Sequence, residues 1–487
     1  LILELDSHTA DAGVETRIEA FLDIVQRYRA SQNQTTVQSE PQYRQTVGYV
    51  ASKKYYITDS EGKSHRLNDD SVEIVVPSMG AIASRLLAAS FQYAGYNATY
   101  LEPATSTDLA TGRSNATCKE CLPYIIVCGS ILNDIAKRQM EDPNKVLVYF
   151  MADSSGPCRF GQYHVQIEQC IRQKRIKNVA ILTLTSDNGY SGLDSRFFFR
   201  AWQAIVISDV MMEAENTLLA LAKDKRHAAD VMKAASAMVF DAVATMPWRS
   251  LRQTLTSVVE LFRDIPLVKR KDEVPKVSLL GEIFVRNDEF SRQNLIRWFS
   301  DSGIMVKIAP NEEFIYFCDF LLQNSLYHVK LPFAQKAELF LAGIAKRYAE
   351  RSIKNIFAQS GLIENELINI RHTVGISESL LSPRFTAGES VLTVGSALEQ
   401  NGKVDGIISI GPFGCLACRV SDAILSSTLR QRSGEDWRSL VPAPSRGNTP
   451  YMGLETDGNP HSMLTEAKLE MFSAQVRKHF DNANKSE

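Results

Sequence analysis

The sequence has no long apolar run, no excess of charge of either sign and few histidines. Its 487 residues include 54 Lys and Arg against 56 Asp and Glu, a net charge of −2. This balance, without a long basic run, gives no reason to expect nucleic acid or an anionic membrane as a partner. No apolar segment reaches the roughly 18 residues that a membrane-spanning helix needs, and no signal-peptide pattern opens the chain. We therefore expect a soluble, cytoplasmic protein.

Motifs of nucleotide and zinc-enzyme chemistry are also missing. The sequence contains no P-loop, and no GxGxxG follows a predicted strand, so a nucleotide-binding enzyme would lack its phosphate loop. The eight histidines form no HExxH motif. We interpret His8, His164 and His372 as surface residues or hydrogen-bonded core residues, not as metal ligands.

Hydrophobic periodicity predicts an α/β fold with doubly wound parallel sheets. Residues 72–77 and 98–101 are predicted strands on either side of a helix, residues 196–263 are predicted to be almost wholly helical, and residues 277–285 are a predicted strand. The predicted organisation is a tail of a preceding α/β unit at 1–30, a polar connector with a hairpin at 31–70, a first α/β domain with a helical insertion at 71–265, a linker at 266–276 and a second α/β domain at 277–487.

The two ends of the chain share a pattern. LELD at Leu3–Asp6 recurs as LETD at Leu454–Asp457, and each is followed at the same spacing by Glu and Phe in a predicted helix. We therefore expect residues 1–25 to form a strand and a helix like those of residues 451–480. Because the first residues already read as a strand, we expect the sequence to be a piece of a longer polypeptide.

The segment Val404–Leu425 shows where this fold would present reactive groups. Val404–Ile410 is a predicted buried strand, a Gly-Pro-Phe-Gly turn ends it, and a helix is predicted to begin near Cys418. Strand-to-helix loops of an open α/β sheet lie at the carboxyl edge of the strands, where ligands bind. The unpaired N–H groups of the following helix stabilise a thiolate, so Cys415 and Cys418 are candidate ligands.

The eight cysteines fall into two groups. In a cytosolic chain they are not expected to form a disulfide framework. Three of them lie inside apolar helical patterns, as small core side chains do: Cys128, Cys170 and Cys318. The other five lie in loops, most of them rich in Gly and Pro, next to predicted helices: Cys118, Cys121, Cys158, Cys415 and Cys418.

Three interpretations of the loop cysteines remain open at this point. An iron–sulfur cluster fits best, because soft thiolates ligate iron and loop glycines let backbone N–H groups approach the sulfides. Two CxxC pairs could instead make a structural zinc site, but such sites are typical of small modules that need zinc to fold. The third interpretation is that these are inert buried thiols near a sheet edge.

Six segments carry a resemblance to a known family: HTADAGVETRIEAF, KECLP, SGPCRFGQY, GEIFVRND, GESVLTVGSALE and DGIISIGPFGC. They resemble the C-terminal region of the large activase-related proteins of the 2-hydroxyacyl-CoA dehydratase and benzoyl-CoA reductase system. Those proteins look like fusions of ATP-binding activator domains with regions similar to the dehydratase subunits. The resemblance implies tandem flavodoxin-like domains with long helical insertions that hold an iron–sulfur cluster between them.

Carried over by position, the family's cysteines fall on Cys121 in KECLP, Cys158 in SGPC and Cys415 in PFGC. Cys118 and Cys418 are additional to that pattern. They leave open whether the cluster is a 4Fe–4S cubane or a double cubane, which would need about six thiolates. The resemblance does not identify a catalytic residue.

These observations predict an iron–sulfur electron-transfer or reductase module. It would receive low-potential electrons from an ATP-driven activator, with ATP bound on that partner or on an upstream domain, and would reduce or dehydrate a small substrate such as an acyl-CoA thioester. The alternative is a non-catalytic scaffold or regulatory domain that docks an activase and holds zinc or no metal. The oligomeric state stays open, with a homodimer as one option.

Overall fold

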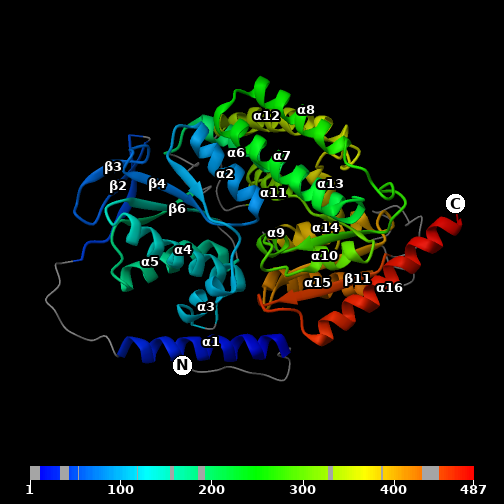
Figure 1. Cartoon of the computed structure of the whole chain (residues 1–487), viewed down its shortest axis with the longest axis horizontal. Helices are drawn as coiled ribbons and strands as arrows, with labels where there is room; N and C mark the ends of the chain where they lie inside the picture. The colour runs from blue at the N-terminus through cyan, green and yellow to red at the C-terminus, as the bar shows by residue number, and fades with distance from the viewer. Residues whose placement is uncertain are drawn as a thin grey trace. The chain divides into compact units, whose positions relative to one another are not determined.

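A computed structural model gives the protein two compact units, Leu1–Phe198 (unit 1) and Phe199–Glu487 (unit 2) (Figure 1). The structure describes residues 11–32, 43–52, 54–117, 119–153, 158–184, 192–326, 333–384, 388–429 and 449–486. The division falls inside helix α6 (Ser195–Leu221). Each unit contains its own four-stranded parallel sheet.

Unit 1 begins with a helix and a small antiparallel sheet before its main sheet. Helix α1 (Asp11–Gln32) is followed by β1 (Val47–Ala51), β2 (Lys54–Thr58) and β3 (Ser64–Arg66), which pair in that order. The hairpin predicted in this region is therefore confirmed. The strand predicted at the start of the chain lies outside the described residues, whereas the helix predicted after it is present as α1.

The main sheet of unit 1 has the strand order β5-β4-β6-β7, with every neighbouring pair parallel. Its interior residues, such as Ile74 and Val148, are fully buried, which explains why these strands are predominantly apolar. The elements are β4 (Val72–Val76), α2 (Ala81–Tyr93), β5 (Ala98–Tyr100), α3 (Ser106–Ser114), α4 (Leu122–Glu141), β6 (Val146–Ala152), the 3₁₀ helix η1 (Arg159–Gln162), α5 (Tyr163–Gln173) and β7 (Val179–Leu184).

Unit 2 begins with long helices and continues into a sheet of order β11-β10-β8-β9, again all parallel. Its elements after α6 are α7 (Lys225–Thr245), α8 (Trp248–Arg263), β8 (Lys276–Gly281), α9 (Ile283–Asn287), α10 (Leu295–Asp301), β9 (Met305–Ile308), α11 (Asn311–Gln323), α12 (Phe333–Ala358), α13 (Ile370–Glu378), α14 (Glu389–Gln400), β10 (Gly406–Pro412), α15 (Leu416–Thr428), β11 (Tyr451–Thr456) and α16 (Met463–Ser486).

The two main sheets have the same topology. When the four strands of each sheet are numbered in chain order, they lie side by side in the order 2-1-3-4. This is the order of a flavodoxin-like doubly wound sheet. The point at which the strand order reverses lies between β4 and β6 in unit 1 and between β8 and β10 in unit 2. The predicted tandem flavodoxin-like α/β fold with long helical insertions is confirmed.

The strand predicted at residues 277–285 is shorter in the structure, and its second half is helical. Strand β8 ends at Gly281, whose φ of +108° belongs to the left-handed region that favours glycine. The carboxylate of Glu282 then accepts a hydrogen bond from the backbone N–H of Val285 at 2.8 Å and caps α9. A run of apolar residues concealed this turn from hydrophobic periodicity.

The segment predicted as a linker, residues 266–276, lies within unit 2. The carbonyl of Pro266 accepts from the backbone N–H of Lys223 at 2.9 Å, and the N–H of Val268 donates to the carbonyl of Leu221 at 2.8 Å. These bonds join the start of the segment to the end of α6. Helices α7 and α8 therefore belong to the same compact unit as the second sheet.

The described helices include no candidate membrane span. Within the part of the chain that the structure describes, none combines the length and the apolar character that crossing a membrane requires. The longest of them, α6, has 27 residues and includes Arg200, Asp209 and Glu213.

Candidate functional site

Three of the predicted ligands occupy the same kind of position. Cys121 is the N-cap residue of α4, Cys158 directly precedes η1, and Cys415 is the N-cap residue of α15. The prediction that each of these cysteines precedes a helix is confirmed. Cys118 lies outside the described residues. Cys418 lies in the first turn of α15, where it is buried.

In unit 1 the two cysteine loops are neighbours. The guanidinium of Arg159, next to Cys158, donates to the backbone carbonyl of Lys119, two residues before Cys121. The thiol of Cys121 contacts the hydroxyl of Tyr163 at the start of α5. Cys121 is buried, whereas Cys158 is exposed. The carboxyl edge of this sheet therefore presents two thiols on connected loops.

In unit 2 the cysteines follow the strand that lies next to β8. Strand β10 ends at Pro412, and Gly414, with φ of +70°, turns the chain into α15. The Cys418 sulfur lies 3.9 Å from the carbonyl oxygen of Ile410. A Cβ added to Gly411 would be only 2.2 Å from that sulfur, so the absence of a side chain at residue 411 makes room for the thiol.

The thiols of unit 2 are surrounded by ionisable groups. A hydrogen bond with Cys415, together with burial, raises the pKa of Cys418 above its ordinary value. Burial, with a smaller contribution from Cys415, raises the pKa of Glu282 to about 7. Burial and the neighbouring Glu282 also raise the pKa of Glu389. This edge therefore combines thiols with carboxyl groups that can hold a proton near neutral pH.

One buried cation balances these carboxyl groups. Arg286 in α9 is 2% exposed, and its guanidinium lies 3.6 Å from the carboxylate of Glu389. It also donates to the carbonyl of Gly281 at 3.0 Å and to that of Pro310 at 3.2 Å. Arg286 thus links the end of β8, the start of α11 and the start of α14. Its charge partly offsets the burial that raises the pKa of Glu282 and Glu389, the carboxyl groups that Cys415 also influences.

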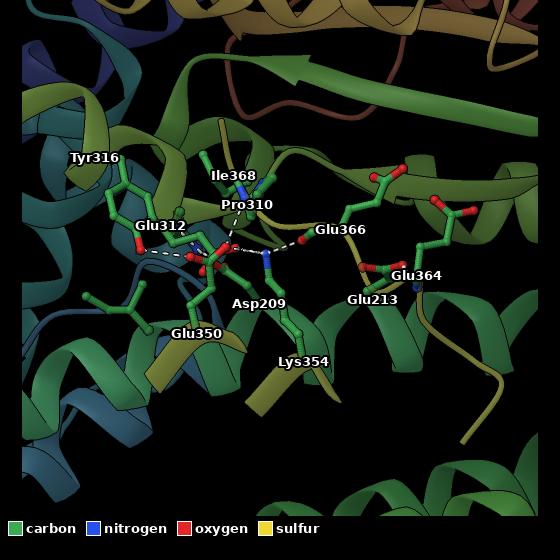
Figure 2. Close-up of polar contacts among 12 residues, drawn as sticks. Asp209, Glu213, Pro310, Glu312, Tyr316, Glu350, Lys354, Glu364, Glu366 and Ile368 are labelled. Carbon is green, nitrogen blue, oxygen red and sulfur yellow. Dashed lines mark hydrogen bonds and ion pairs between the residues drawn. The ribbon is translucent and has the colours of Figure 1, made fainter. Parts of the chain in front are cut away.

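A second buried polar cluster lies at the start of α11 in unit 2. Figure 2 shows the carboxyl groups of Asp209, Glu312 and Glu350, from helices α6, α11 and α12, gathered around the ammonium of Lys354. Lys354 forms ion pairs with Glu312 and, at 3.2 Å, with Glu350. The hydroxyl of Tyr316 donates to Glu350 at 2.7 Å.

Sequence reasoning missed this cluster. Asp209 accepts from the backbone N–H of Glu312 at 3.0 Å, which places a carboxylate at the N-terminus of α11. Burial and the carboxylates of Asp209 and Glu350 outweigh Lys354 and raise the pKa of Glu312 to about 8. The one available signal was the pair of acids after Pro310, which marks a helix start but reveals nothing about its burial.

The structure locates four of the five predicted metal ligands, two in each unit. Among the described residues, no three His, Cys, Asp or Glu side chains are grouped so that they could hold a metal ion. Unit 1 contributes Cys121 and Cys158 from the described part, and unit 2 contributes Cys415 and Cys418. Neither unit alone contains the three ligands of the predicted pattern within its described residues.

Comparison with known proteins gives no family for this chain. No protein-family model matches it, and no curated protein is similar to it. The resemblance carried by the cysteine loops and their flanking segments therefore remains a prediction, and the functional argument rests on the fold and on the two sheet edges.

Proposed function

We propose that this chain holds an iron–sulfur cluster through Cys121, Cys158 and Cys415 and transfers low-potential electrons to a small substrate such as an acyl-CoA thioester. The observation that carries the proposal is the shared position of the three thiols. Each lies at the start of a helix, in a loop at or near the carboxyl edge of a flavodoxin-like sheet. Such positions favour thiolates and negatively charged groups.

The donor set fits the chemistry of such a cluster. Thiolates are the usual ligands of iron in these centres, and hydrogen bonds to sulfur adjust their reduction potential. Tyr163 contacts the Cys121 sulfur in this way. Near Cys415, Arg286 supplies a buried positive charge. The cluster itself would supply one-electron storage, while the protein supplies ligands, burial and charge.

The electrons would come from an ATP-driven activator domain, upstream in the same polypeptide or on a partner. The sequence of this chain has no P-loop or dinucleotide-binding motif, so ATP would act elsewhere. Cys118 and Cys418 are candidates for further ligands.

A non-catalytic scaffold that docks an activase and holds zinc or no metal is the second candidate. The observation behind it is the pair of CxxC motifs, Cys118–Cys121 and Cys415–Cys418, whose four thiols could instead bind zinc. Metal content separates the two candidates directly, because a zinc scaffold contains no iron or labile sulfide.

The test is anaerobic purification or reconstitution of the chain, followed by iron, zinc and sulfide analysis and electron paramagnetic resonance after reduction. The proposed function predicts that Cys158→Ser and Cys415→Ser lose iron and visible absorbance and keep their far-UV circular dichroism. Cys318→Ser, which changes a cysteine of α11 away from both loops, is the control and should keep its iron. Full iron content in both loop variants would refute the proposed ligands.

A further inference from the structure

Helix α12 (Phe333–Ala358) carries apolar residues on two faces. One face packs into unit 2, where Ala349, Ile353 and Phe357 are fully buried. The other face is formed by large side chains that are 64%, 65%, 55% and 58% exposed: Phe340, Leu341, Ile344 and Tyr348, respectively. At 100° per residue these four lie on the side of the helix opposite the buried face. We call them the α12 stripe.

The spacing of the α12 stripe is that of a helix-pairing seam. Ala337, Leu341, Ile344 and Tyr348 follow one another at intervals of four, three and four residues. This is the spacing of the core positions of a coiled coil, in which each side chain inserts between residues of a facing helix. A helix with a second apolar face of this kind is expected to be covered.

We propose that the α12 stripe is the interface of a homodimer, in which α12 of one copy pairs antiparallel with α12 of a second copy. The stripe is complementary to itself in size. In an antiparallel pair centred between residues 342 and 343, Leu341 faces Ile344 of the other copy. The two aromatic rings, Phe340 and Tyr348, then face the alanines at 345 and 337, so each large side chain meets a small one.

Charge and area are consistent with a second copy as the occupant. The stripe is flanked by charges of both signs, including Lys336, Glu338 and Arg347, so it has no single-sign field that would select an acidic or basic partner. Side chains of this size, exposed to this extent, present on the order of 100 Å² each, which gives about 400 Å² per copy. That area, about 800 Å² over both copies, is below a standard interface, so we expect the dimer to be weak and reversible.

The first test is the mass of the full chain in solution, measured by analytical ultracentrifugation between about 1 and 100 µM. The wild-type chain should change from monomer to dimer across this range. Ile344→Glu should remain monomeric, because it places two charges in the seam. Leu464→Glu changes an equally exposed leucine on α16, 58% exposed, and should dimerise like the wild type.

The second test examines the antiparallel register. Leu341→Lys and Ile344→Glu should each be monomeric alone, and an equimolar mixture should form a dimer, because Lys at 341 then faces Glu at 344. All these positions are more than half exposed, so circular dichroism and thermal unfolding should be unchanged. A wild-type chain that stays monomeric at the highest concentration, or a dimer that survives Ile344→Glu, would overturn the proposal.

Discussion

The two cysteine-bearing sheet edges share one topology and differ in the groups around their thiols. In unit 1 the thiol of Cys121 contacts the neutral hydroxyl of Tyr163. In unit 2 Cys415 lies beside ionisable groups, Glu282 and Glu389, and near Arg286. Strand order alone therefore does not determine the chemistry of an edge. The loops and helices that follow the strands decide which groups lie next to each thiol: a tyrosine hydroxyl at Cys121, and carboxyl groups with raised pKa values near Cys415.

The largest expected effect concerns the turn at Gly281, which places Glu282 at the end of strand β8. A Cβ added to Gly281 would lie 2.0 Å from the carbonyl oxygen of Ile410, and φ is +108° there. Gly281→Ala should destabilise unit 2 by about 4 kcal/mol, measured by urea unfolding with hydrogen exchange to assign the loss. At Gly303, φ is +71° and an added Cβ would have no atom within 4 Å. Gly303→Ala should therefore lower the free energy of unfolding by only about 1 kcal/mol. Equal losses would show that close approach is not the cause.

The next prediction compares the loss of a buried charge near Cys415 with the loss of a charge on the protein surface. Arg286→Met leaves Glu389 without its cation in a buried place and should cost about 3 kcal/mol at pH 8. The loss should shrink at pH 5, where the carboxyl groups with raised pKa values are protonated. Arg85→Met removes an exposed pair with Glu102 in unit 1 and should cost less than about 0.5 kcal/mol. A loss for Arg286→Met that does not change with pH would contradict this reading.

Glu312 gives a pH effect inside unit 2. Its pKa rises from 4.5 to about 8 in the folded protein, so the folded state binds a proton that the unfolded state has released between these values. Stability should therefore fall as pH rises from about 5 to 8. Glu312→Gln should flatten that fall in urea unfolding measured at several pH values. Glu366→Gln, whose side chain is 62% exposed, is the control.

The smallest effect belongs to the contact between Tyr163 and Cys121 in unit 1. Tyr163→Phe removes the hydroxyl that contacts the Cys121 sulfur and should cost about 1 kcal/mol. Because no carboxyl group is involved in that contact, the cost should be the same at pH 6 and pH 8. Tyr49→Phe loses an exposed hydrogen bond to Ser64 and should change stability by a few tenths of a kcal/mol. A strong pH dependence for Tyr163→Phe would remove the contrast between the two edges.

Sequence periodicity predicted the elements that bury regular apolar faces. The strands at Val72–Val76 and Ala98–Tyr100 were predicted nearly to the residue, because apolar periodicity and nearby Gly or Pro define both. The cysteine loops were found because thiols beside Gly and Pro are an unusual pattern. The helix at Ile283–Asn287 was missed, because its start depends on one glycine conformation and one capping carboxylate.

The charged surroundings of Cys415 could not be predicted in the same way. Glu282 and Arg286 belong to α9 and its cap, whereas Glu389 begins α14, and their proximity follows from how α9 and α14 meet. Likewise, nothing in the local sequence of Glu350 or Asp209 indicates that both contribute to one buried cluster. Local patterns report which face of an element is apolar, whereas polar clusters of this kind depend on long-range packing.

The pairing of β8 with β10 has a consequence for the order in which the protein acquires its structure. Gly406 pairs with Val277, and the whole passage from α9 to α14 lies between these strands, whereas Val72 and Val146 of unit 1 are joined by a shorter interval. A longer interval raises the entropic barrier to forming the first native contacts. On a ribosome, unit 1 can therefore complete its sheet while the strand that precedes Cys415 has yet to emerge, and the cysteines of unit 1 are in place first.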